Sequence, residues 1–431
     1  MIPKSSKMSL LGSSTPCADR GLNCTGTMET PPSFSETDGR LLGDVNSRPG
    51  AFVLFLIDEL ATAGGAELAL VNLVRLLPSH GFRCAVATFR LKPGSDLPRL
   101  LSCPVHVFPL RRAYDINAAH QAWRLARLIR SEKVQIVHTF FETSDLWGGF
   151  IARLSGCPIL ISSRRDMGIL RLRKHRLAYR MIGRILDRVQ AVSDQVRQFC
   201  ITTDRLPEDK VITIHNGVEL ERIDSGFLPV EHGQPGEIND TAPLIVCVAN
   251  IRVVKGIDRF IRAAVLVHKE FPNARFAVIG GVLEESHFQE LRHLADSLDL
   301  GGHFRFLGPQ KDVFRFLHTA SAFCLLSRSE GFSNSIIEAM ACRLPCVVTD
   351  VGGNREAITD GDNGFIVADE NEAAQRILQL LQDREFARRM GDLARCTVEE
   401  RFTVEAMVRK TASLYQSLLH TRMNSPCRNW I

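Results

Sequence analysis

The sequence predicts an α/β protein built from two doubly wound, parallel-sheet domains. From about residue 50 onward, short apolar segments alternate with longer amphipathic ones, which is the pattern of strands and helices in βαβ units. The alternation stops in residues 225–243, where glycine and proline gather among polar residues, and then begins again. At 431 residues the chain is also too long for one typical hydrophobic core.

The first half of the chain opens with the apolar segment Phe52–Ile57, which we predict to be a strand. Gly64-Gly65 begins the helix that follows, whose leucines and valines recur at helical spacing. Gly81 ends this helix, because glycine readily adopts the left-handed conformation found after helices. Further strands are expected at 84–88, 105–108, 134–138, 158–162, 188–192 and 211–214, and helices at 116–131, 143–154 and 170–186, with Ser193 as the N-cap of another.

The second half repeats the alternation. Strands are expected at 244–249, 275–279, 303–307, 323–326 and 345–349, and helices at 256–269, 284–298, 312–319, 370–382, 384–397 and 403–420. We therefore divide the chain into a disordered extension (1–48), an N-terminal Rossmann-like domain (49–224), a linker (225–243), a C-terminal Rossmann-like domain (244–400), and a final helix with a tail (401–431) that could cross back to the first domain.

The composition is that of a globular protein, with 45% hydrophobic and 23% charged residues. The formal net charge of +5 is too small to imply a nucleic-acid partner by itself. Twelve cysteines are scattered without a Cys-x-x-Cys pair, and Cys342 and Cys346 suit core packing better than metal binding. Such cysteines favour a reducing compartment. No apolar run reaches the about 18 residues of a membrane span, and the start of the chain lacks a signal peptide, so we predict a cytoplasmic protein.

Residues 327–358 carry the clearest chemical signal. They leave an apolar strand, cross a small polar loop, enter a helix and return to a second strand. The N-terminus of such a helix presents backbone N–H groups that favour an anionic ligand. Glu330 precedes the helix and Glu338 lies within it. This spacing does not put both carboxylates on one helical face, so they fit two different tasks. Glu338 could accept hydrogen bonds from a ribose or, alternatively, be a capping or surface charge.

Arg252 and Lys255 follow the first strand of the second domain. Ligands of doubly wound sheets bind at the carboxyl ends of strands, where these two cations are well placed for phosphate. An arginine grips two phosphate oxygens, and a lysine acts as a point charge. The alternative is a solvated loop, which the neighbouring helix-start glycine, Gly256, makes less attractive.

The chain resembles the group one, or family 4, retaining glycosyltransferases of the GT-B fold over about residues 52–420. The resemblance rests on the joint order of several short motifs. These are Glu330-x7-Glu338 with Gly331 and Phe332, the continuation Ala339-Met340-Ala341, Pro345, Gly352-Gly353, Arg252 with Lys255-Gly256, and Asn216-Gly217-Val218.

The resemblance implies transfer of a hexose from a nucleotide-diphosphate sugar with retention of anomeric configuration. The roles of the matching family positions imply that Arg252 and Lys255 hold the diphosphate and that Glu338 holds the ribose. They also imply that Glu330 lies by the hydroxyls of the donor sugar. The resemblance further implies that the backbone amides of Phe332, Ser333, Asn334 and Ser335 bind the nucleotide sugar, with added hydrogen bonds from the Asn334 and Ser335 side chains. The turn at Gly64 and Gly65 would approach the nucleotide sugar from the first domain.

The resemblance also implies a division of labour between the domains, with the acceptor on the first and the nucleotide sugar on the second. No cofactor or metal is expected, because the two cations and the helix terminus would neutralise the leaving diphosphate. A same-face mechanism, in which the leaving phosphate oxygen takes the proton of the acceptor, is favoured over a glutamate nucleophile.

Three segments depart from the family pattern. The family often carries His-x-His where this chain reads His138-Thr-Phe140. His138 is therefore predicted either to reach the sugar as a catalytic residue, with Glu330, Lys255 and Arg252, or to serve in the core. The segment after Ile279 reads Gly280-Gly281-Val-Leu-Glu-Glu and lacks the commoner Gly-Asp-Gly form, which puts donor contacts there in question. Arg164-Arg165-Asp166 would face the acceptor, or be a surface charge and helix cap.

Residues 164–188 hold nine arginines and lysines against two aspartates, interleaved with leucine and isoleucine. A basic amphipathic segment of this kind can lie on an anionic membrane surface. We therefore expect peripheral docking on the inner face of the membrane, which would bring a lipid-linked acceptor within reach. A solvated helix face explains the same composition.

The predicted function is glycosyl transfer to a glycan or lipid-linked acceptor in cell-surface polysaccharide or glycolipid synthesis. A UDP-sugar epimerase of the same fold is the nearer alternative, and it differs because epimerisation consumes no acceptor. A nucleic-acid-binding protein is the remote one, since it would not need the two glutamates and would show salt-dependent retention of RNA. The sequence does not specify the sugar, the base or the acceptor.

Overall fold

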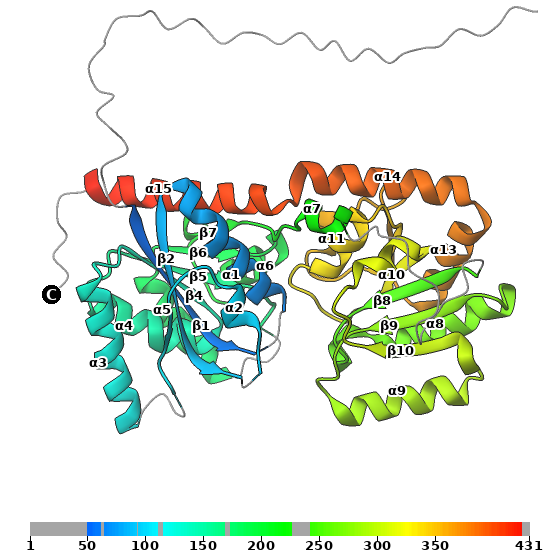
Figure 1. Cartoon of the computed structure of the whole chain (residues 1–431), viewed down its shortest axis with the longest axis horizontal. Helices are drawn as coiled ribbons and strands as arrows, with labels where there is room; N and C mark the ends of the chain where they lie inside the picture. The colour runs from blue at the N-terminus through cyan, green and yellow to red at the C-terminus, as the bar shows by residue number, and fades with distance from the viewer. Residues whose placement is uncertain are drawn as a thin grey trace, which may run out of the picture. The chain divides into compact units, whose positions relative to one another are not determined.

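The structure is a computed structural model that describes residues 50–61, 64–92, 94–110, 115–168, 173–225 and 242–424 (Figure 1). The predicted extension over 1–48 and nearly all of the predicted linker 225–243 lie outside these residues.

The first half of the chain forms a sheet of seven parallel strands in the order β3-β2-β1-β4-β5-β6-β7. The strands are β1 (Ala51–Leu60), β2 (Phe82–Leu91), β3 (Val105–Val107), β4 (Ile136–Phe140), β5 (Ile159–Arg164), β6 (Arg188–Ala191) and β7 (Val211–Thr213). The helices are α1 (Gly65–Leu76), α2 (Leu97–Leu100), α3 (Ile116–Ser131), α4 (Gly149–Leu154), α5 (Arg173–Ile185), α6 (Asp194–Thr202) and α7 (Leu220–Ser225).

The second half forms a sheet of six parallel strands in the order β10-β9-β8-β11-β12-β13. The strands are β8 (Leu244–Val248), β9 (Arg275–Ile279), β10 (Phe304–Gly308), β11 (Ala322–Leu325), β12 (Cys346–Thr349) and β13 (Phe365–Val367). The helices are α8 (Ile257–Glu270), α9 (Glu285–Ser297), α10 (Phe314–Thr319), α11 (Asn334–Ala341), α12 (Asn354–Ala357), α13 (Glu370–Gln382), α14 (Arg384–Arg401) and α15 (Val404–Asn424). The predicted α/β class with two doubly wound parallel sheets is confirmed.

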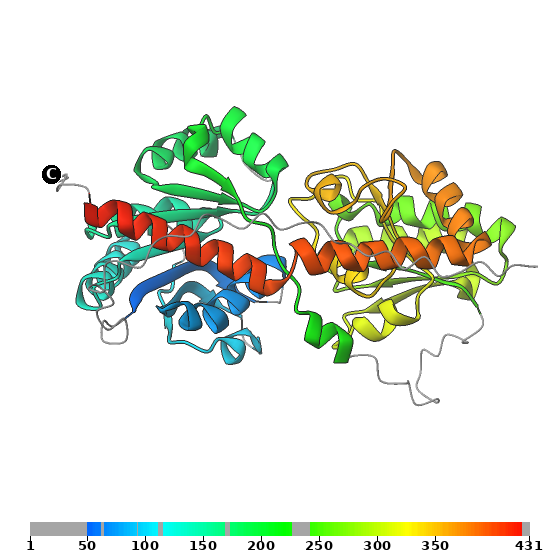
Figure 2. The same ribbon diagram turned by 90° about the horizontal axis from the view of Figure 1, so that it is seen from above.

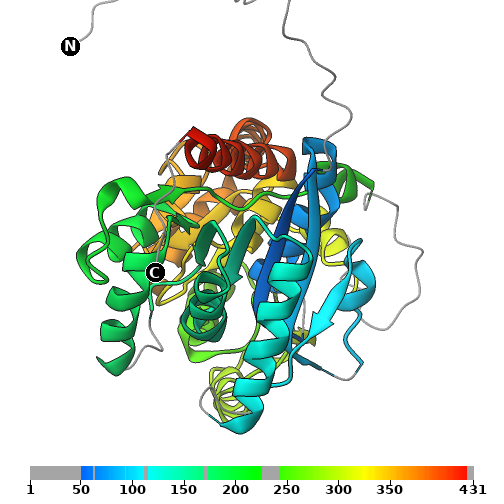
Figure 3. The ribbon, with the colours of Figure 1, turned by 90° about the vertical axis from the view of Figure 1, so that its left-hand side faces the viewer.

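Alternation along β1 explains the layers of the first sheet. Val53, Phe55 and Ile57 point to one side, where they pack with α1 and α15, and Leu54 and Leu56 point to the other, where they pack with α3, α4 and α5 (Figure 3). Every one of these five side chains is fully buried. Strands that are covered on both faces read as continuous apolar runs, as this one does.

The final helix returns to the first sheet. α14 contacts α11 of the second half, and α15 then packs against α1, with Met407 and Tyr415 buried in the same cluster as β1 (Figure 2). The crossing is fixed at Val218, whose backbone N–H donates to Phe402 O at 2.9 Å and whose carbonyl accepts from Val404 N at 3.1 Å. The chain therefore passes between the two halves twice, first through residues 225–243 and again at this crossing.

Local signals predicted several element ends correctly. Gly81 is left-handed, with φ of 82°, and its N–H bonds the carbonyls of Leu77 and Pro78. Ser193 caps α6 by accepting from Val196 N at 3.2 Å. The predicted helix at 143–154 differs, because residues 144–148 form a π-helical turn before α4. β13 was not predicted, since a three-residue strand shows no periodicity.

In both sheets the strand order reverses beside the first strand, between β1 and β4 and between β8 and β11. Ligands of doubly wound folds bind beyond the carboxyl ends of the strands at such switch points. None of the helices that the structure describes has the length and apolar character needed to cross a membrane.

Candidate active site

Lys255 is presented by a tight loop after β8. Residues Val253–Lys255 form one 3₁₀ turn, and Gly256 then adopts a left-handed conformation with φ of 62°. A Cβ on Gly256 would overlap the carbonyl oxygen of Leu326 at the end of β11, so glycine allows the two strand ends to approach closely. This approach brings Lys255 Nζ to 2.7 and 2.9 Å from the two carboxylate oxygens of Glu330.

Glu330 lies in the loop between β11 and α11 and is only 8% exposed. Its Oε1 also accepts from Ser327 Oγ at 2.7 Å. Gly352, with φ of 54°, lies so close that a Cβ would overlap the Glu330 carbonyl oxygen. The structure thus unites two predicted site residues that are 75 positions apart in the sequence.

Arg252 lies on the same loop but has a different partner. Its Nε is 3.4 Å from Glu284 Oε1, and Glu284 also accepts from Val253 N at 2.8 Å. The Val253 hydrogen bond is the largest cause that lowers the pKa of Glu284, and Arg252 adds to it. Glu284 belongs to the segment 280–285 that departs from the family pattern, and it is the carboxylate with which Arg252 pairs.

The N-terminus of α11 follows the loop that carries the predicted residues 332–335, and no side chain caps its first turn. The side chain of the N-cap residue Ser333 accepts no hydrogen bond from the backbone N–H groups of the first turn, and its Oγ bonds Ser335 Oγ instead, at 3.1 Å. Phe332 anchors the loop, because its ring packs 4.9 Å from His215 and 5.3 Å from Phe402. The Phe332 side chain therefore serves packing, and its backbone is what the loop presents.

The Gly64-Gly65 turn of the first half meets α11. A Cβ on Gly65 would lie 3.2 Å from Asn334 Nδ2. Asn334 Oδ1 accepts from Asn216 Nδ2 at 2.6 Å, and Arg165 donates to Asn216 Oδ1 and, at 3.4 Å, to Gly65 O. Gly64, Gly65 and Asn334 are thus brought together, through an Arg165–Asn216 link that the sequence reasoning did not place in the site.

Glu356 was also missed. This carboxylate of α12 accepts from the backbone N–H groups of Asp194 and Gln195 at 2.8 and 3.1 Å, which lie in the first turn of α6. It also lies 2.6 Å from His215 Nε2. A helix N-terminus stabilises a negative charge, so this contact helps to hold the second half against the first. In the sequence, the position of Glu356 shortly after Gly352-Gly353 was the one feature that could have pointed to it.

Glu338 lies in the middle of α11 and is half-buried. Burial raises the pKa of its carboxyl to about 6, and the positive charge of Arg222 offsets part of that rise. Among the described residues, the Glu338 carboxylate has no hydrogen-bond donor. The Glu338 oxygens are not among the buried polar atoms left without a partner, so water can reach them. A carboxylate whose pKa is raised by burial and whose oxygens stay open to solvent is typical of a position that binds a ligand.

His138 is not brought to the other predicted residues. Its side chain is fully buried, its Nδ1 lies 2.6 Å from the Tyr415 hydroxyl of α15, and its ring packs against Phe55 and Phe140. Burial, with a smaller effect of Arg165, lowers the pKa of His138 to about 3, so the imidazole is neutral. This placement argues against the catalytic role predicted for His138 and supports its alternative role in the core.

Two family models match the chain. Residues 63–222 match Glycosyltransferase Family 4, and residues 231–396 match Glycosyl transferases group 1. An N-acetyl-alpha-D-glucosaminyl L-malate synthase of Bacillus anthracis is 31% identical over 224 residues, which cover 51% of this chain and only 56% of that protein. A capsular polysaccharide biosynthesis glycosyltransferase of Staphylococcus aureus, CapM, is 24% identical, covering 76% of this chain and 88% of the relative.

Solved structures share the fold. HepE from Anabaena, solved in complex with UDP and glucose, superposes with a TM-score of 0.72 at 19% identity, covering 85% of this chain and all of that one. A glycosyltransferase from Rickettsia africae superposes with a TM-score of 0.74 at 20% identity, covering 87% of this chain and all of its own. With two consecutive family models and the two parallel sheets in agreement, this chain belongs to the group 1 glycosyltransferases of the GT-B fold.

Proposed function

We propose that this protein is a retaining glycosyltransferase that moves a hexose from a nucleotide-diphosphate sugar to a glycan or lipid-linked acceptor. The observation that carries the proposal is the meeting of Lys255 with Glu330 beside the N-terminus of α11. Its biological setting would be the synthesis of cell-surface polysaccharide or glycolipid, as the name of the Staphylococcus aureus relative suggests.

The leaving diphosphate would lie against the first turn of α11. Backbone N–H groups and the positive end of the helix favour negative charge there. Lys255 uses two of its three N–H groups on Glu330 and could offer the third to a phosphate oxygen, and Arg252 could bind phosphate by releasing Glu284. These groups would stabilise the charge that develops as the glycosidic bond breaks, so we propose that no metal is needed.

Retention is proposed to follow a same-face course. Both carboxylate oxygens of Glu330 are held by Lys255, and one is held by Ser327 as well. A carboxylate occupied in this way is a poor nucleophile but a good partner for the hydroxyls of the donor sugar. The leaving phosphate oxygen would then accept the proton of the attacking hydroxyl, and Glu338 would accept hydrogen bonds from the ribose.

Product analysis tests this function directly. The protein is first screened by thermal shift against UDP-, GDP- and ADP-sugars, beginning with UDP-glucose, and then incubated with the stabilising donor and simple glycosides. We expect release of the nucleoside diphosphate, a new α-linked product by NMR, and full activity in EDTA. An inverted linkage would contradict the retaining mechanism, and loss of activity in EDTA would contradict metal independence. Epimerisation of the donor without consumption of an acceptor would favour the epimerase. Retention of RNA without binding of any nucleotide sugar would favour a nucleic-acid-binding protein.

Peripheral membrane docking is proposed for the face formed by α3, α4 and α5. α4 contacts both of the other helices, and the exposed side chains of this face include Trp123, Phe150, Leu154 and Met181. The guanidinium of Arg127 lies 5.5 Å over the Trp123 ring. Interfacial aromatic rings with arginines around them suit an anionic membrane surface. The inner face of the cytoplasmic membrane is the surface we propose.

Vesicle sedimentation checks the docking face. The W123S/F150S double variant should bind phosphatidylglycerol-containing vesicles roughly tenfold more weakly than the native protein, because two aromatic side chains no longer enter the interface. Leu393→Ser is the matched control, since Leu393 is 52% exposed on α14 and outside the face. Equal sedimentation of all three proteins, or none for the native protein, would contradict docking through this face.

A further inference from the structure

An arginine in the loop after β11 holds the turn that carries Lys255. Arg328 lies two residues before Glu330, and its backbone N–H donates to Val254 O at 2.8 Å. Its side chain reaches the same turn, because Nη1 donates to Val253 O at 3.0 Å. Two consecutive carbonyl groups of the turn are therefore bonded by one residue from the neighbouring strand end.

The guanidinium of Arg328 is fixed by a bidentate pair with Asp258. Its Nη1 and Nη2 each lie 2.7 Å from one oxygen of the Asp258 carboxylate, which belongs to the first turn of α8. An arginine that binds a carboxylate through two parallel hydrogen bonds has a defined orientation. Asp258 therefore sets the direction from which Arg328 reaches the turn.

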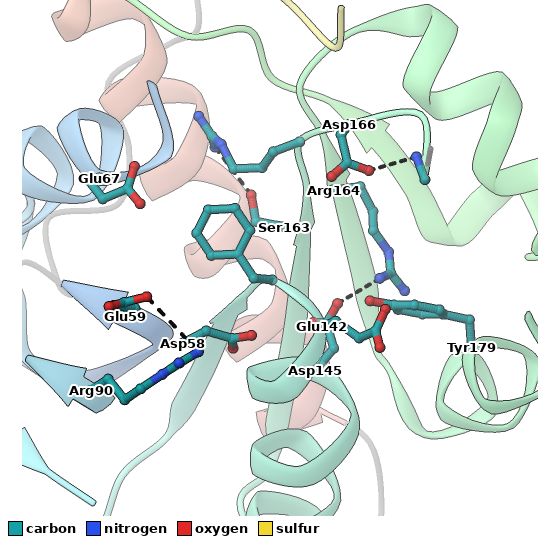
Figure 4. Close-up of a pocket in the computed structure, with 13 residues that line it drawn as sticks. Asp58, Glu59, Glu67, Arg90, Glu142, Asp145, Ser163, Arg164, Asp166 and Tyr179 are labelled. Atoms are coloured by element: carbon teal, nitrogen blue, oxygen red, sulfur yellow. Dashed lines mark hydrogen bonds and ion pairs between the residues drawn. The ribbon is translucent and has the colours of Figure 1, made fainter. Parts of the chain in front are cut away.

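A second arginine–aspartate pair, in the first half, has different surroundings. Arg164 and Asp145 line a pocket of about 400 Å³ beyond the carboxyl ends of β1, β4 and β5, and Figure 4 shows them bonded to each other. Their side chains are 2% and 1% exposed, so this pair belongs to the core. The side chains of Arg328 and Asp258 are 36% and 22% exposed. An ion pair that is open to solvent usually adds little to stability, so the contact of Arg328 with the turn is its more informative feature.

The turn depends on hydrogen bonds because it has little packing. Val253 is 49% exposed, and its N–H donates to Glu284 Oε2 at 2.8 Å on the side away from Arg328. On the proposed function, Arg252 releases Glu284 when the diphosphate binds. The bonds of Arg328 go to carbonyl groups and to Asp258, none of which takes part in that exchange. Arg328 can therefore hold the turn in place while Arg252 moves.

The same loop also fixes the carboxylate that Lys255 bonds. Ser327 precedes Arg328 directly, and its Oγ donates to Glu330 Oε1 at 2.7 Å. The Ser327 carbonyl accepts from Thr349 Oγ1 at 2.7 Å, which ties the loop to the end of β12. Residues 327–330 thus hold both the turn and the partner of the Lys255 ammonium group. A displacement of Arg328 would move that ammonium group relative to Glu330.

We propose that Arg328 is a positioning residue for the transfer reaction, which holds the Lys255 ammonium group where the leaving diphosphate develops its charge. The proposal rests on the glycosyltransferase function given above, and it adds a residue to the donor side of that function. Arg328 acts through Lys255 and not on the diphosphate itself. Precise placement matters here, because a shift of about 1 Å in a reacting or charge-stabilising group can lower a rate by about a hundredfold.

Hydrogen–deuterium exchange tests the positioning without a donor. Arg328→Gln removes the charge and the paired N–H groups, so the turn should open more often. The amides of Lys255 and Gly256 bond carbonyls three residues earlier, and they should exchange about tenfold faster in the variant. Arg388→Gln is the matched control, since Arg388 also pairs with an aspartate, Asp392, but on α14. It should leave exchange in the turn unchanged.

A double-mutant cycle tests the consequence for catalysis. With the donor found by thermal shift, Arg328→Gln should lower kcat about tenfold or more and change the donor KM less than about threefold. In the Lys255→Ala protein the same substitution should change kcat less than about twofold, because the group that Arg328 positions is already gone. Arg328→Lys should recover part of the rate, since lysine keeps the charge but not the bidentate geometry.

Asp258→Asn provides a milder variant, which serves if Arg328→Gln does not fold. It leaves the bonds from Arg328 to the turn and loosens only the guanidinium. Its kcat and its exchange rates should therefore lie between those of the native protein and of Arg328→Gln, and native values for both would overturn the inference.

The outcomes separate this inference from the proposed function. Native kcat or native exchange in Arg328→Gln would overturn the inference. Equal losses of kcat with and without Lys255 would also overturn it, because they would show a structural role that does not pass through Lys255. In each case a slow Lys255→Ala protein would leave the proposed function standing. Near-normal turnover in Lys255→Ala, or no binding of any nucleotide sugar, would overturn the donor site and this inference with it.

Discussion

Replacing Lys255 with alanine should lower kcat by about a hundredfold or more while changing the donor KM much less. Lys255 is placed to meet charge that develops on the leaving diphosphate, and a contact that strengthens in the transition state is expressed in kcat. Its bonds to Glu330, at 2.7 and 2.9 Å, also fix the carboxylate that would hold the donor sugar. The variant therefore loses a positive charge, and of the described residues only Ser327 still bonds the Glu330 carboxylate.

Single-turnover and steady-state rates with the donor found by thermal shift provide the measurement. Lys255→Arg keeps the charge but not the compact ammonium group, so it should recover only part of the rate. Lys269→Ala is the matched control, because Lys269 is exposed at the other end of α8. Near-normal turnover in Lys255→Ala would show that the diphosphate does not lie where we place it.

The sequence was sufficient to place Lys255 and Glu330 individually at strand ends. Each follows an apolar strand, and parallel strands in a doubly wound sheet direct their carboxyl ends to one edge. The pairing itself depends on the strand order β8-β11, which brings together residues 75 positions apart. Gly256 was a usable hint, since its left-handed conformation is what lets the two loops touch.

Other contacts could not be predicted because no local pattern encodes them. Asn216 and Asn334 are 118 positions apart, and His138 meets Tyr415 across 277. Burial of His138 depends on where α15 lies, and an amphipathic pattern says which face of a helix is buried but not against what. The pairing of Arg252 with Glu284 could not be predicted for a related reason. Residues 280–285 differ in sequence from the family pattern, but that difference does not say which side chain Arg252 contacts.

Replacing Glu338 with glutamine should stabilise the free protein and weaken donor binding. The pKa of Glu338 is raised from 4.5 to about 6 by burial, so the folded protein binds its proton more tightly than the unfolded chain does. As the pH rises through this range, folding requires the ionised carboxylate to stay buried, which costs about 2 kcal/mol above pH 6 and nothing below pH 4.5. Glutamine has no charge to bury, and it should recover about 1–2 kcal/mol at pH 8.

The same substitution should raise the donor KM by about tenfold or more, because a carboxylate can accept two hydrogen bonds from a ribose and an amide oxygen accepts them less strongly. Denaturant unfolding at pH 4.5 and pH 8, together with donor titration, measures both effects. Ile336→Val in the same helix controls for packing, since it should cost stability equally at both pH values. A Glu338→Gln protein that is less stable at pH 8 would mean that the carboxylate is satisfied within the fold. A more stable protein with weakened donor binding would instead show that Glu338 is retained for its ligand at the expense of stability.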